Sequence, residues 1–346
     1  MRKRIVSAAL ALLLLTQAGC LRDSRPVEGT TFAMDTVMTL TLYGGWDRER
    51  TKEGRDWMMG RLVYFDQLLS AASETSDVAR INRSNGQPVE VCELTARLLD
   101  QALALCELTG GALDITACPA VKAWGFTTGE HRIPSGEELA ALAEKIDSSA
   151  VRLEGNMVTL PEGMEIDLGA VAKGYAGDQS RETAQSYGIT SALIDLGQST
   201  IVAVGGKPDG SPWRIGVVDP AQPEDYFAVV ELEDMAMGTS GGYQRYFEAD
   251  GVTYWHILDP ETAAPARSGL SSVTVVAPSA LTCDSLSTAL FVMGLEEAAQ
   301  FWREHPALEF EAIFVTEEGE IYRTAGLEGR FSLAEGYRDR EVTVLE

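Results

Sequence analysis

Alternating and helical patterns of hydrophobic residues predict the first elements of the chain. The alternation in FAMDTVMTLTLYG predicts a strand over residues 32–44. A helix is predicted near residues 53–70. Its apolar face is formed by Trp57, Tyr64, Phe65 and Leu68. A second helix, at about 93–109, ends at a glycine pair, 110–111, which is a helix stop signal.

The second half of the chain changes to strand-like patterns. A capping box opens a short helix over residues 135–145. From residue 190 onward, short apolar runs between turn-forming residues predict strands: SALIDLG, STIVAVGG, WRIGVVD, AVVELEDMAMG, TYWHILD and SSVTVVAP. Helices return at about 284–305, before a hairpin that turns at residues 318–319. This order predicts an α+β fold that forms one catalytic unit with two lobes.

The segment TCDSLSTALFVMG, residues 282–294, combines an apolar helical stripe with oxygen-bearing side chains. The stripe consists of Leu286, Ala289, Leu290 and Met293. Asp284 and Thr288 are one helical turn apart, with Ser287 beside them, so a carboxylate and hydroxyls face one point that could hold a hard cation. The residues alone favour another interpretation, in which Asp284 is an N-cap and the hydroxyls bond to the preceding turn. Both interpretations stay open.

Composition and charge narrow the class of protein. The 346 residues are 45% hydrophobic and 23% charged, which is typical of a globular protein with one large domain or two ordinary ones. The net charge is -24. Because nucleic-acid binders need a basic surface, this charge excludes a general nucleic-acid binder.

The N-terminal residues are typical of an export signal. Residues 1–20, MRKRIVSAALALLLLTQAGC, combine a basic start, an apolar run too short to span a membrane, and small residues before a cysteine. The ending TQAGC resembles a bacterial lipobox, in which Cys20 is lipidated, although Gln17 is unusual there; simple secretion is the alternative. We expect an extracytoplasmic protein anchored by lipid to the cytoplasmic membrane. A tether would follow over residues 21–30 and a catalytic domain over residues 31–335.

The remaining cysteines favour neither a zinc site nor a dense disulfide framework. Cys92, Cys106, Cys118 and Cys283 include no CxxC pair, and none adjoins a histidine. A disulfide between Cys92 and Cys106 is left open and is not predicted.

Two glycine-containing segments are candidate ligand sites. IDLGAVAKGYAGD, residues 166–178, places an acid at the end of a predicted strand, Gly169 at a turn and Lys173 early in a helix. Free backbone N–H groups at such a helix start attract phosphate. GTSGGYQRYF, residues 238–247, is a loop of small residues, including Ser240, that would let a ligand approach the backbone. An ordinary strand-to-helix turn and a plain hairpin turn are the alternatives.

A histidine and two aromatic residues are further candidates. In YWHILDPETAAP, residues 254–265, His256 alternates with apolar residues on a predicted strand, as either a catalyst or a satisfied core residue. In GALDITACPAVKAWGF, residues 111–126, an aspartate at a predicted strand start precedes Trp124 and Phe126. Those two rings could cover a flat ligand or simply pack in the core.

Taken together and in order, these stretches resemble the ApbE family of FAD:protein FMN transferases. The matching segments are FAMDT, YFDQLLS, DVARIN, GALDITACPAVKAWGF, DLGAVAKGYAGD, SALIDLG, GTSGGYQRYF, HILDPETAAP, SVTVVAP and CDSLSTAL. The likeness spans roughly residues 30–325, and the ordered set is specific although single segments are not. It implies an ApbE-like mixed fold with two lobes around a flavin and metal cleft.

The resemblance assigns roles to individual residues. The family's FAD contacts fall on Met34, Ala112, Leu113, Asp114, Asp167, Lys173 and Leu258, and Ser240 is added as a cofactor-binding candidate. The family's divalent cation, usually magnesium, falls on the Ala170 carbonyl and on Asp284, Ser287 and Thr288. Oxygen ligands of these kinds suit Mg²⁺.

The implied reaction is Mg²⁺-dependent transfer of FMN from FAD to a Thr or Ser hydroxyl of an exported or membrane redox protein, with release of AMP. Asp284 would hold the cation, and His256 would accept the hydroxyl proton, because an unperturbed imidazole titrates near neutral pH. Two alternatives are hydrolysis of FAD to FMN and AMP, and a flavin-binding lipoprotein without catalysis. The implied partners are FAD, an acceptor flavoprotein subunit and, through the lipid, the membrane.

Some residues depart from the family pattern. Ser287 stands where a second aspartate is common, which should weaken metal affinity. Cys118 and Ala263 stand where glycine is common, and Ala72 stands where relatives often carry an aromatic residue that stacks on the cofactor. These departures bear on affinity more than on reaction class.

Overall fold

The computed structural model describes residues 25–44 and 47–346. The predicted signal peptide, Cys20 and the first part of the tether lie outside these residues. Strand β1 begins at Val27, so the prediction that the tether reaches residue 30 is wrong. In the described part of the chain, none of the helices is both long enough and apolar enough to cross a membrane.

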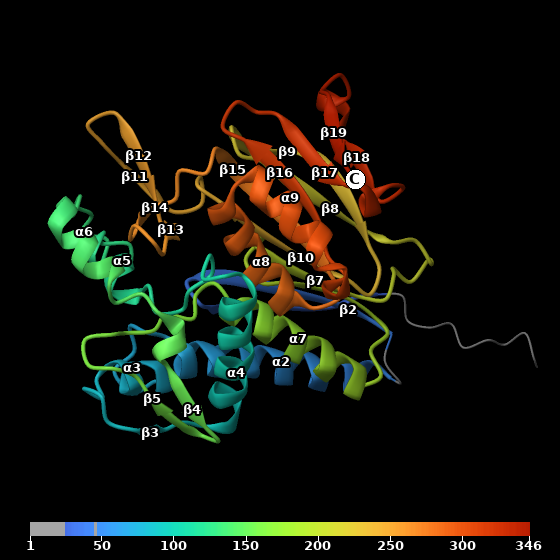
Figure 1. Ribbon diagram of the computed structural model, residues 1–346. Helices are drawn as coiled ribbons and strands as arrows, with labels where there is room; N and C mark the ends of the chain where they lie inside the picture. Colours follow the sequence, from blue (N-terminus) through green and yellow to red (C-terminus); the bar gives the residue numbers. More distant parts are fainter. Residues whose placement is uncertain (1–24, 45–46) are drawn as a thin grey trace, which may run out of the picture.

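Figure 1 shows the arrangement of the helices and strands. The helices are α2 (Arg48–Leu69), α3 (Asp77–Asn82), α4 (Glu93–Leu108), α5 (Cys118–Ala123), α6 (Gly136–Ala143), α7 (Ala172–Ser186), α8 (Ala280–Met293) and α9 (Leu295–Glu304). The strands are β1 (Val27–Ala33), β2 (Thr36–Tyr43), β3 (Val89–Glu90), β4 (Arg152–Glu154), β5 (Met157–Thr159), β6 (Ser191–Asp195), β7 (Thr200–Val204), β8 (Trp213–Asp219), β9 (Gln222–Leu232), β10 (Ala236–Gly241), β11 (Tyr246–Ala249), β12 (Val252–Trp255), β13 (Leu258–Asp259), β14 (Ala264–Pro265), β15 (Leu270–Ala277), β16 (Glu311–Thr316), β17 (Ile321–Thr324), β18 (Phe331–Leu333) and β19 (Val342–Leu345).

A central sheet organises the described residues. Its nine strands follow the order β1-β2-β6-β7-β10-β15-β16-β17-β19. Neighbouring strands are antiparallel except β17 and β19. The central strands β7 and β15 are buried along almost their whole length, because layers cover both faces of the sheet.

The two covering layers differ in kind. Helices α2, α4, α7 and α8 pack on one face around the main hydrophobic core. The three-stranded sheet β18-β9-β8 covers the other face, with Trp213, Phe227 and Leu232 in its core. This arrangement confirms the α+β class, whereas the division into two lobes stays a prediction.

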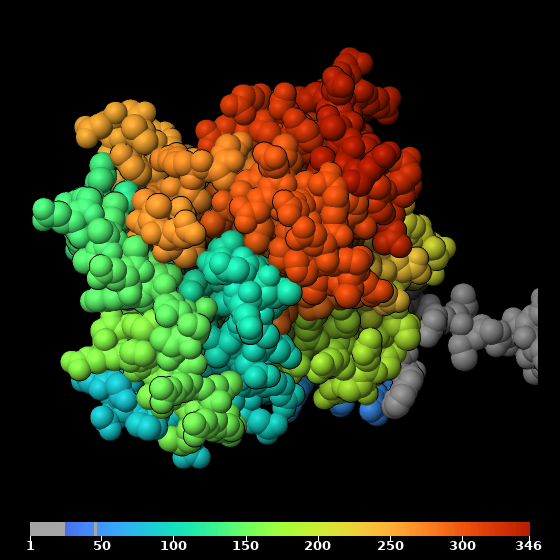
Figure 2. Space-filling model, in the orientation of Figure 1, coloured from blue at the N-terminus to red at the C-terminus, as the bar shows by residue number. Residues whose placement is uncertain are grey.

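A smaller aromatic cluster joins α5 and α6 to the hairpins β11–β12 and β13–β14. The Trp124 and Tyr254 ring centroids lie 5.3 Å apart, and Phe247 stacks on Tyr254 at 5.2 Å. These segments form the left edge of the space-filling view in Figure 2. The cluster thus has its own set of contacts beside the main core.

The first predicted strand is in fact a hairpin. Residues 32–44 contain the end of β1, a turn at Met34 and Asp35, and all of β2. The two turn residues have φ values of 51° and 59°. Positive φ at both positions suits a two-residue hairpin turn, but Met-Asp is not a dipeptide that signals one.

The apolar face predicted for α2 is partly wrong, although the helix itself is confirmed. Trp57 is 57% exposed and Tyr64 is 42% exposed, whereas Met58, Leu62 and Phe65 are completely buried. Both sets recur at helical spacing. Packing of α2 against β1 and α7 selects the second set.

Several other boundaries differ from the sequence patterns. The helices α4 and α6 and the hairpin β16–β17 confirm the predictions. The helix predicted over residues 284–305 is two helices that meet at Gly294, where φ is 81°. The run TYWHILD breaks after Trp255, and AVVELEDMAMG divides near Asp234, whose φ is 51°. Each of these boundaries lies at a local turn, which the spacing of apolar residues does not predict.

Helix α7 packs directly on the start of α8 at Gly174. A Cβ atom at this position would lie 2.4 Å from the Ala280 carbonyl oxygen and 2.7 Å from Leu281 Cα. Both are backbone atoms and cannot rotate away. The absence of a side chain at Gly174 therefore sets the distance between the two helices.

We expect Gly174→Ala to lower the free energy of unfolding by about 1–3 kcal/mol, because the added methyl group overpacks this contact. Gly60→Ala is a matched control, since Gly60 also lies within a helix but an added Cβ there has no neighbour within 4 Å. This control should gain up to about 1 kcal/mol. Urea unfolding followed by circular dichroism measures both variants. Wild-type stability in Gly174→Ala would contradict the conclusion that Gly174 sets the distance between α7 and α8.

Candidate functional site

Asp284 lies in the second turn of α8, not at its N-cap. Ser279 caps α8 with its own side chain. The Asp284 carboxylate is buried, and its Oδ1 accepts a hydrogen bond from Thr200 Oγ1 at 2.9 Å. Its Oδ2 accepts one from the Gly174 backbone N–H at 2.8 Å. The interpretation of Asp284 as the cap of its own helix is therefore wrong, because it caps the first turn of α7.

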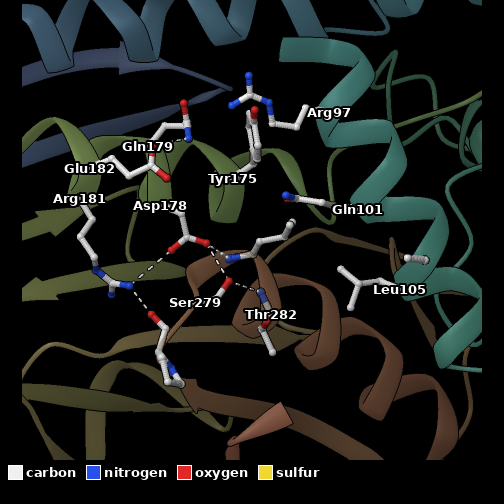
Figure 3. A pocket seen from close by; sticks show the side chains of 13 residues that line it. Arg97, Gln101, Leu105, Tyr175, Asp178, Gln179, Arg181, Glu182, Ser279 and Thr282 are labelled. Atoms are coloured by element: carbon white, nitrogen blue, oxygen red, sulfur yellow. Dashed lines mark hydrogen bonds and ion pairs between the residues drawn. The ribbon is translucent and has the colours of Figure 1, made fainter. Parts of the chain in front are cut away.

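Helix α7 supplies the matching cap to α8, as Figure 3 shows. Asp178 Oδ1 accepts a hydrogen bond from the Ala280 N–H at 2.8 Å. Asp178 Oδ2 accepts one from the Leu281 N–H at 3.0 Å and one from Ser279 Oγ at 2.7 Å. The N–H groups at a helix start lack partners in their own helix and attract carboxylates. Each helix therefore supplies the anion that the other needs.

A cavity of about 620 Å³ lies between α4, α7 and the start of α8. Figure 3 shows side chains that line it. None of the site residues predicted from the sequence lines it. Two lining residues, Tyr175 and Arg181, carry polar atoms without a hydrogen-bond partner among the described residues, but those atoms are sealed from solvent. A molecule in the cavity could not contact them. The chemistry predicted from the sequence therefore lies around Asp284 and not in this cavity.

Three hydroxyl groups gather beside Asp284. Ser240 Oγ on β10 lies 2.8 Å from Ser287 Oγ and 3.1 Å from Thr288 Oγ1. Ser287 Oγ also lies 3.0 Å from the Asp284 carbonyl oxygen, to which it donates. The structure thus brings Ser240, which was predicted from a separate segment, into the group predicted to hold a cation.

The close contact between α8 and β10 explains this meeting. A Cβ atom at Gly238 would lie 2.7 Å from the backbone carbonyl carbon of Cys283. Ser240 is two residues further along β10, and Ser287 is four residues further along α8. Because side chains repeat every two residues on a strand and about every 3.6 on a helix, both side chains stay on the contact face. The segment containing Ser240 is accordingly a strand at this point and not the predicted loop.

The Ser287 and Thr288 hydroxyls both bond to the Asp284 carbonyl oxygen, at 3.0 and 3.4 Å, so the alternative in which they bond to the preceding turn is confirmed. The oxygen atoms of this cluster are nevertheless of the kinds that a hard divalent cation binds. One carboxylate and three hydroxyls are ligands of the kind that Mg²⁺ binds, together with water and substrate phosphates. Within residues 25–44 and 47–346, no group of three or more His, Cys, Asp or Glu residues could hold a metal. The site would therefore depend on Asp284 as its carboxylate. Ala170, the predicted carbonyl ligand, is half-buried in the turn before α7.

The charges around Asp284 come from Lys173 and the start of α7. Burial raises the pKa of the Asp284 carboxyl, and the Lys173 charge, the Gly174 N–H and the Thr200 hydroxyl oppose this rise. Lys173 Nζ itself donates a hydrogen bond to Ser199 Oγ. The structure thus places a carboxylate and an ammonium group in one buried region.

Three backbone N–H groups near the start of α7 have partners within the protein. The Leu168 carbonyl accepts hydrogen bonds from the N–H groups of Val171 and Ala172, at 3.0 and 2.8 Å. Asp284 takes the N–H of Gly174. The protein's own oxygen atoms therefore occupy the N–H groups of Val171, Ala172 and Gly174, so these three are not free to bind a phosphate. Phosphate binding by Lys173 stays a prediction.

Asp167 begins a turn and does not end the predicted strand. Its N–H donates to the Ile115 carbonyl at 2.8 Å, and its Oδ1 accepts from the Gly169 N–H at 2.7 Å. Burial raises the pKa of the Asp167 carboxyl, whereas the Gly169 N–H and the charges of Arg245 and Lys122 lower it. The carboxylate thus closes a turn and lies within reach of two cationic side chains.

The segment 112–114 lies in the turn before α5, adjacent to the Asp167 turn. Leu113 is buried in the main core, and Ala112 packs against that core. Asp114 Oδ1 accepts from the Thr116 N–H at 2.7 Å, and its Oδ2 accepts from the Ser148 N–H at 2.9 Å. The Asp114 side chain therefore holds its own turn together and does not begin a strand.

Arg245 connects the Met34 turn with His256. Its guanidinium lies 3.7 Å from the carboxylate of Asp35, the neighbour of Met34 in the β1–β2 turn. The Arg245 carbonyl oxygen accepts the His256 N–H at 3.1 Å and lies 3.2 Å from His256 Nδ1. An imidazole that donates its Nδ1–H to this carbonyl leaves Nε2 as an acceptor. This tautomer can accept a proton at Nε2.

The environment of His256 lowers its basicity. Burial, followed by the charges of Arg245 and Lys173, lowers the pKa of His256 to about 4. The unperturbed value assumed from the sequence is therefore wrong, and the imidazole is neutral at pH 7. His256 also follows β12 in a loop and is not part of the predicted strand.

Leu258 belongs to the small aromatic cluster. It is buried against Trp124 and Ala263, and Trp124 Nε1 donates to the Ala263 carbonyl at 2.9 Å. Trp124 is therefore a core residue here, whereas the Phe126 ring lies 6.4 Å from the His256 ring. Ala263 has a φ of 54°, a conformation that favours glycine, which is the residue expected here from the family pattern; nothing in the structure explains the alanine.

Four residues near the site were not singled out from the sequence: Lys122, Ser199, Thr200 and Arg245. Lys122 and Arg245 lie inside segments that carried the resemblance, so their charge was an available signal. Ser199 and Thr200 are small polar residues at the start of a strand, and nothing in their pattern distinguishes them. The cysteines 92, 106, 118 and 283 are free thiols, so the disulfide left open between the first two is not formed.

Comparisons with known proteins place most of the chain in one family. Residues 34–314 match the ApbE family. The FAD:protein FMN transferase of Escherichia coli is 31% identical over 339 residues, which cover 93% of this chain and 94% of that protein. The Vibrio cholerae protein of the same name is 34% identical over 309 residues, which cover 86% and 89%.

Solved structures give the same result for the fold. The crystal structure of the ApbE protein from Thermotoga maritima has a TM-score of 0.82 and 34% identity over 88% of this chain and 98% of that chain. The apo form of the Pseudomonas stutzeri flavinyl transferase ApbE has a TM-score of 0.74 and 29% identity over 90% and 96%. Because sequence and fold both match over most of its length, this chain belongs to the ApbE family.

Proposed function

We propose that the protein transfers FMN from FAD to a Thr or Ser hydroxyl of an exported or membrane redox protein, with Mg²⁺ as the cation and AMP as the product. The buried Asp284 carboxylate, which shares its helix with the Ser287 and Thr288 hydroxyls and is acted on by the Lys173 charge, is the observation that carries this proposal. A cation site beside a fixed positive charge suits a pyrophosphate. The FAD:protein FMN transferases that match most of the chain support the same reaction.

Each polar group of the site has a role in this proposal. The residues that would hold Mg²⁺ are Ala170, Asp284, Ser287 and Thr288. When bound, Mg²⁺ supplies positive charge that offsets the negative charge of the reacting phosphates. Lys173 binds a phosphate oxygen, and Ser199 holds the Lys173 ammonium group in place. Asp167, between Arg245 and Lys122, belongs to the part of the site that contacts FAD.

His256 takes the proton in the transfer step. The acceptor hydroxyl oxygen forms a bond to the phosphorus on the FMN side, and the bond from that phosphorus to the bridging oxygen breaks. AMP leaves with the bridging oxygen, and the hydroxyl proton passes to Nε2 of His256. A neutral imidazole at pH 7 has the lone pair that this step needs, although a pKa of about 4 makes it a weak base.

We expect Asp284→Asn and Asp284→Ala to abolish Mg²⁺-dependent AMP release, because the site loses its carboxylate. Asp178→Asn is the matched control: this carboxylate also caps a helix of the α7–α8 pair, but it lies outside the proposed cation site. The control should keep the wild-type Mg²⁺ midpoint. AMP release is measured from FAD with an acceptor protein over a range of Mg²⁺ concentrations, with folding checked by circular dichroism.

The same measurements discriminate between FMN transfer, hydrolysis of FAD and flavin binding without catalysis. Full activity of Asp284→Asn at the wild-type Mg²⁺ midpoint would reduce Asp284 to a structural cap. AMP release by the wild type at the same rate without an acceptor would favour hydrolysis of FAD. Absence of AMP release with several acceptors, despite FAD binding, would favour a flavin-binding protein.

We expect His256→Ala to slow AMP release by about 10²-fold, near the lower end of the range for a general base, since the group is a weak base. In the wild type, kcat/KM at saturating Mg²⁺ should stay level from pH 8 down to about 5.5, because His256 protonates only near its folded-state pKa of about 4. Saturating Mg²⁺ keeps Asp284 ionised during the titration. A profile that halves near pH 6.5 would show that the buried environment does not govern this histidine.

The N-terminal sequence supports anchoring of the mature protein to the cytoplasmic membrane through Cys20. We expect Cys20→Ser to release the protein from the membrane fraction and to block processing of the signal peptide. Cell fractionation with immunoblotting measures both effects, and labelling with a radioactive fatty acid measures lipidation. Unchanged membrane association and processing in the variant would leave simple secretion, or another means of anchoring, as the explanation.

A further inference from the structure

Two donors from different elements hold the Asp284 carboxylate, one at each oxygen. The Gly174 N–H comes from α7, and the Thr200 hydroxyl comes from β7, 84 residues away from Asp284 in sequence. Thr200 is completely buried. Its hydrogen bond to Asp284 therefore forms without competition from water.

The Thr200 hydroxyl prevents a rotation of the Asp284 carboxylate that the Gly174 N–H alone would allow. The torsion that rotates an aspartate carboxylate about its Cβ–Cγ bond has broad minima. With only the Gly174 N–H in place, the carboxylate could swing about that one contact. A carboxylate has about four lone-pair positions, and the two donors use two of them. The remaining positions then keep fixed directions.

The backbone of Thr200 is itself held in place. Thr200 pairs with Gly238 of β10, and its carbonyl accepts the Leu196 N–H at 2.9 Å. Gly238 is the position at which β10 contacts α8 without an intervening side chain. The strand pair that carries Ser240 to the hydroxyl cluster thus also carries Thr200 to the carboxylate.

We propose that Thr200 is a positioning residue for the cation site. It does not contact the cation; it fixes the rotation of the Asp284 carboxylate so that its unused lone pairs meet a divalent cation shared with the Ser287 and Thr288 hydroxyls. This inference rests on the proposed function for the identity of the cation site. Residues that orient a metal ligand typically change metal affinity by about 10–100-fold when they are replaced.

The test compares Thr200→Val, Thr200→Ser and Thr274→Val. Valine keeps the size of threonine but has no hydroxyl, and serine restores the hydroxyl. Thr274 is a matched control, since it is a buried threonine of the same sheet, on β15, whose hydroxyl lies 2.9 Å from Thr239 Oγ1. The readouts are Mn²⁺ binding to the purified protein by electron paramagnetic resonance, and the Mg²⁺ midpoint of AMP release.

We expect Thr200→Val to weaken Mn²⁺ binding by about 10-fold or more and to raise the Mg²⁺ midpoint by a similar factor. Thr200→Ser should stay within about 3-fold of the wild type, and Thr274→Val should bind Mn²⁺ like the wild type. Wild-type Mn²⁺ affinity in Thr200→Val would overturn the proposal, and so would equal weakening in both valine variants, since that would indicate a general loss of stability.

The readouts also separate this proposal from the proposed function. If the wild type binds Mn²⁺ in a Thr200-dependent way but releases no AMP, the positioning role stands and the transferase function fails. If the wild type binds no Mn²⁺, the cation site is absent and the positioning role fails with it.

Discussion

The capping of the first turn of α7 by Asp284 is the interaction on which the site depends, and Asp178 joins the same two helices by capping α8. Asp284 of α8 accepts an N–H of α7, and Asp178 of α7 accepts two N–H groups of α8. Burial of a carboxylate is costly unless hydrogen bonds and positive charge compensate. The exposed N–H groups and the positive dipole end of each helix supply that compensation. The Gly174 N–H therefore opposes the rise that burial causes in the pKa of Asp284.

Close backbone contacts make this capping geometrically possible. Gly174 allows α7 to touch α8, and Gly238 allows β10 to touch α8. Because α8 is in contact on both sides, residues from three elements reach its second and third turns. The Thr200 hydroxyl, the Ser240 hydroxyl and the Lys173 ammonium group all come to one helix in this way. The same two glycines thus set the packing of α7 and β10 on α8 and bring the polar groups of the site together.

The electrostatics of the site differ from those of the whole chain. The protein carries a net charge of -24, yet Lys122, Lys173 and Arg245 act on the buried groups of the site. These charges oppose the effect of burial on Asp167 and Asp284 and add to it on His256. A negatively charged cofactor would meet these cationic side chains inside an acidic protein. Net charge therefore excludes a class of partner but does not describe the site.

The sequence by itself determined the mixed fold, the helices α4 and α6, the hairpin β16–β17 and the membership of Asp284, Ser287 and Thr288 in one helical face. These features follow from local periodicity and turn chemistry, which act between residues close in the chain. Only the tertiary structure decided which helix Asp284 caps, which face of α2 is buried and how far the pKa of His256 falls. Each of these depends on groups distant in sequence, such as Thr200, Gly174 and Arg245. Burial and contact across such distances are properties of the packed chain, so no local pattern records them.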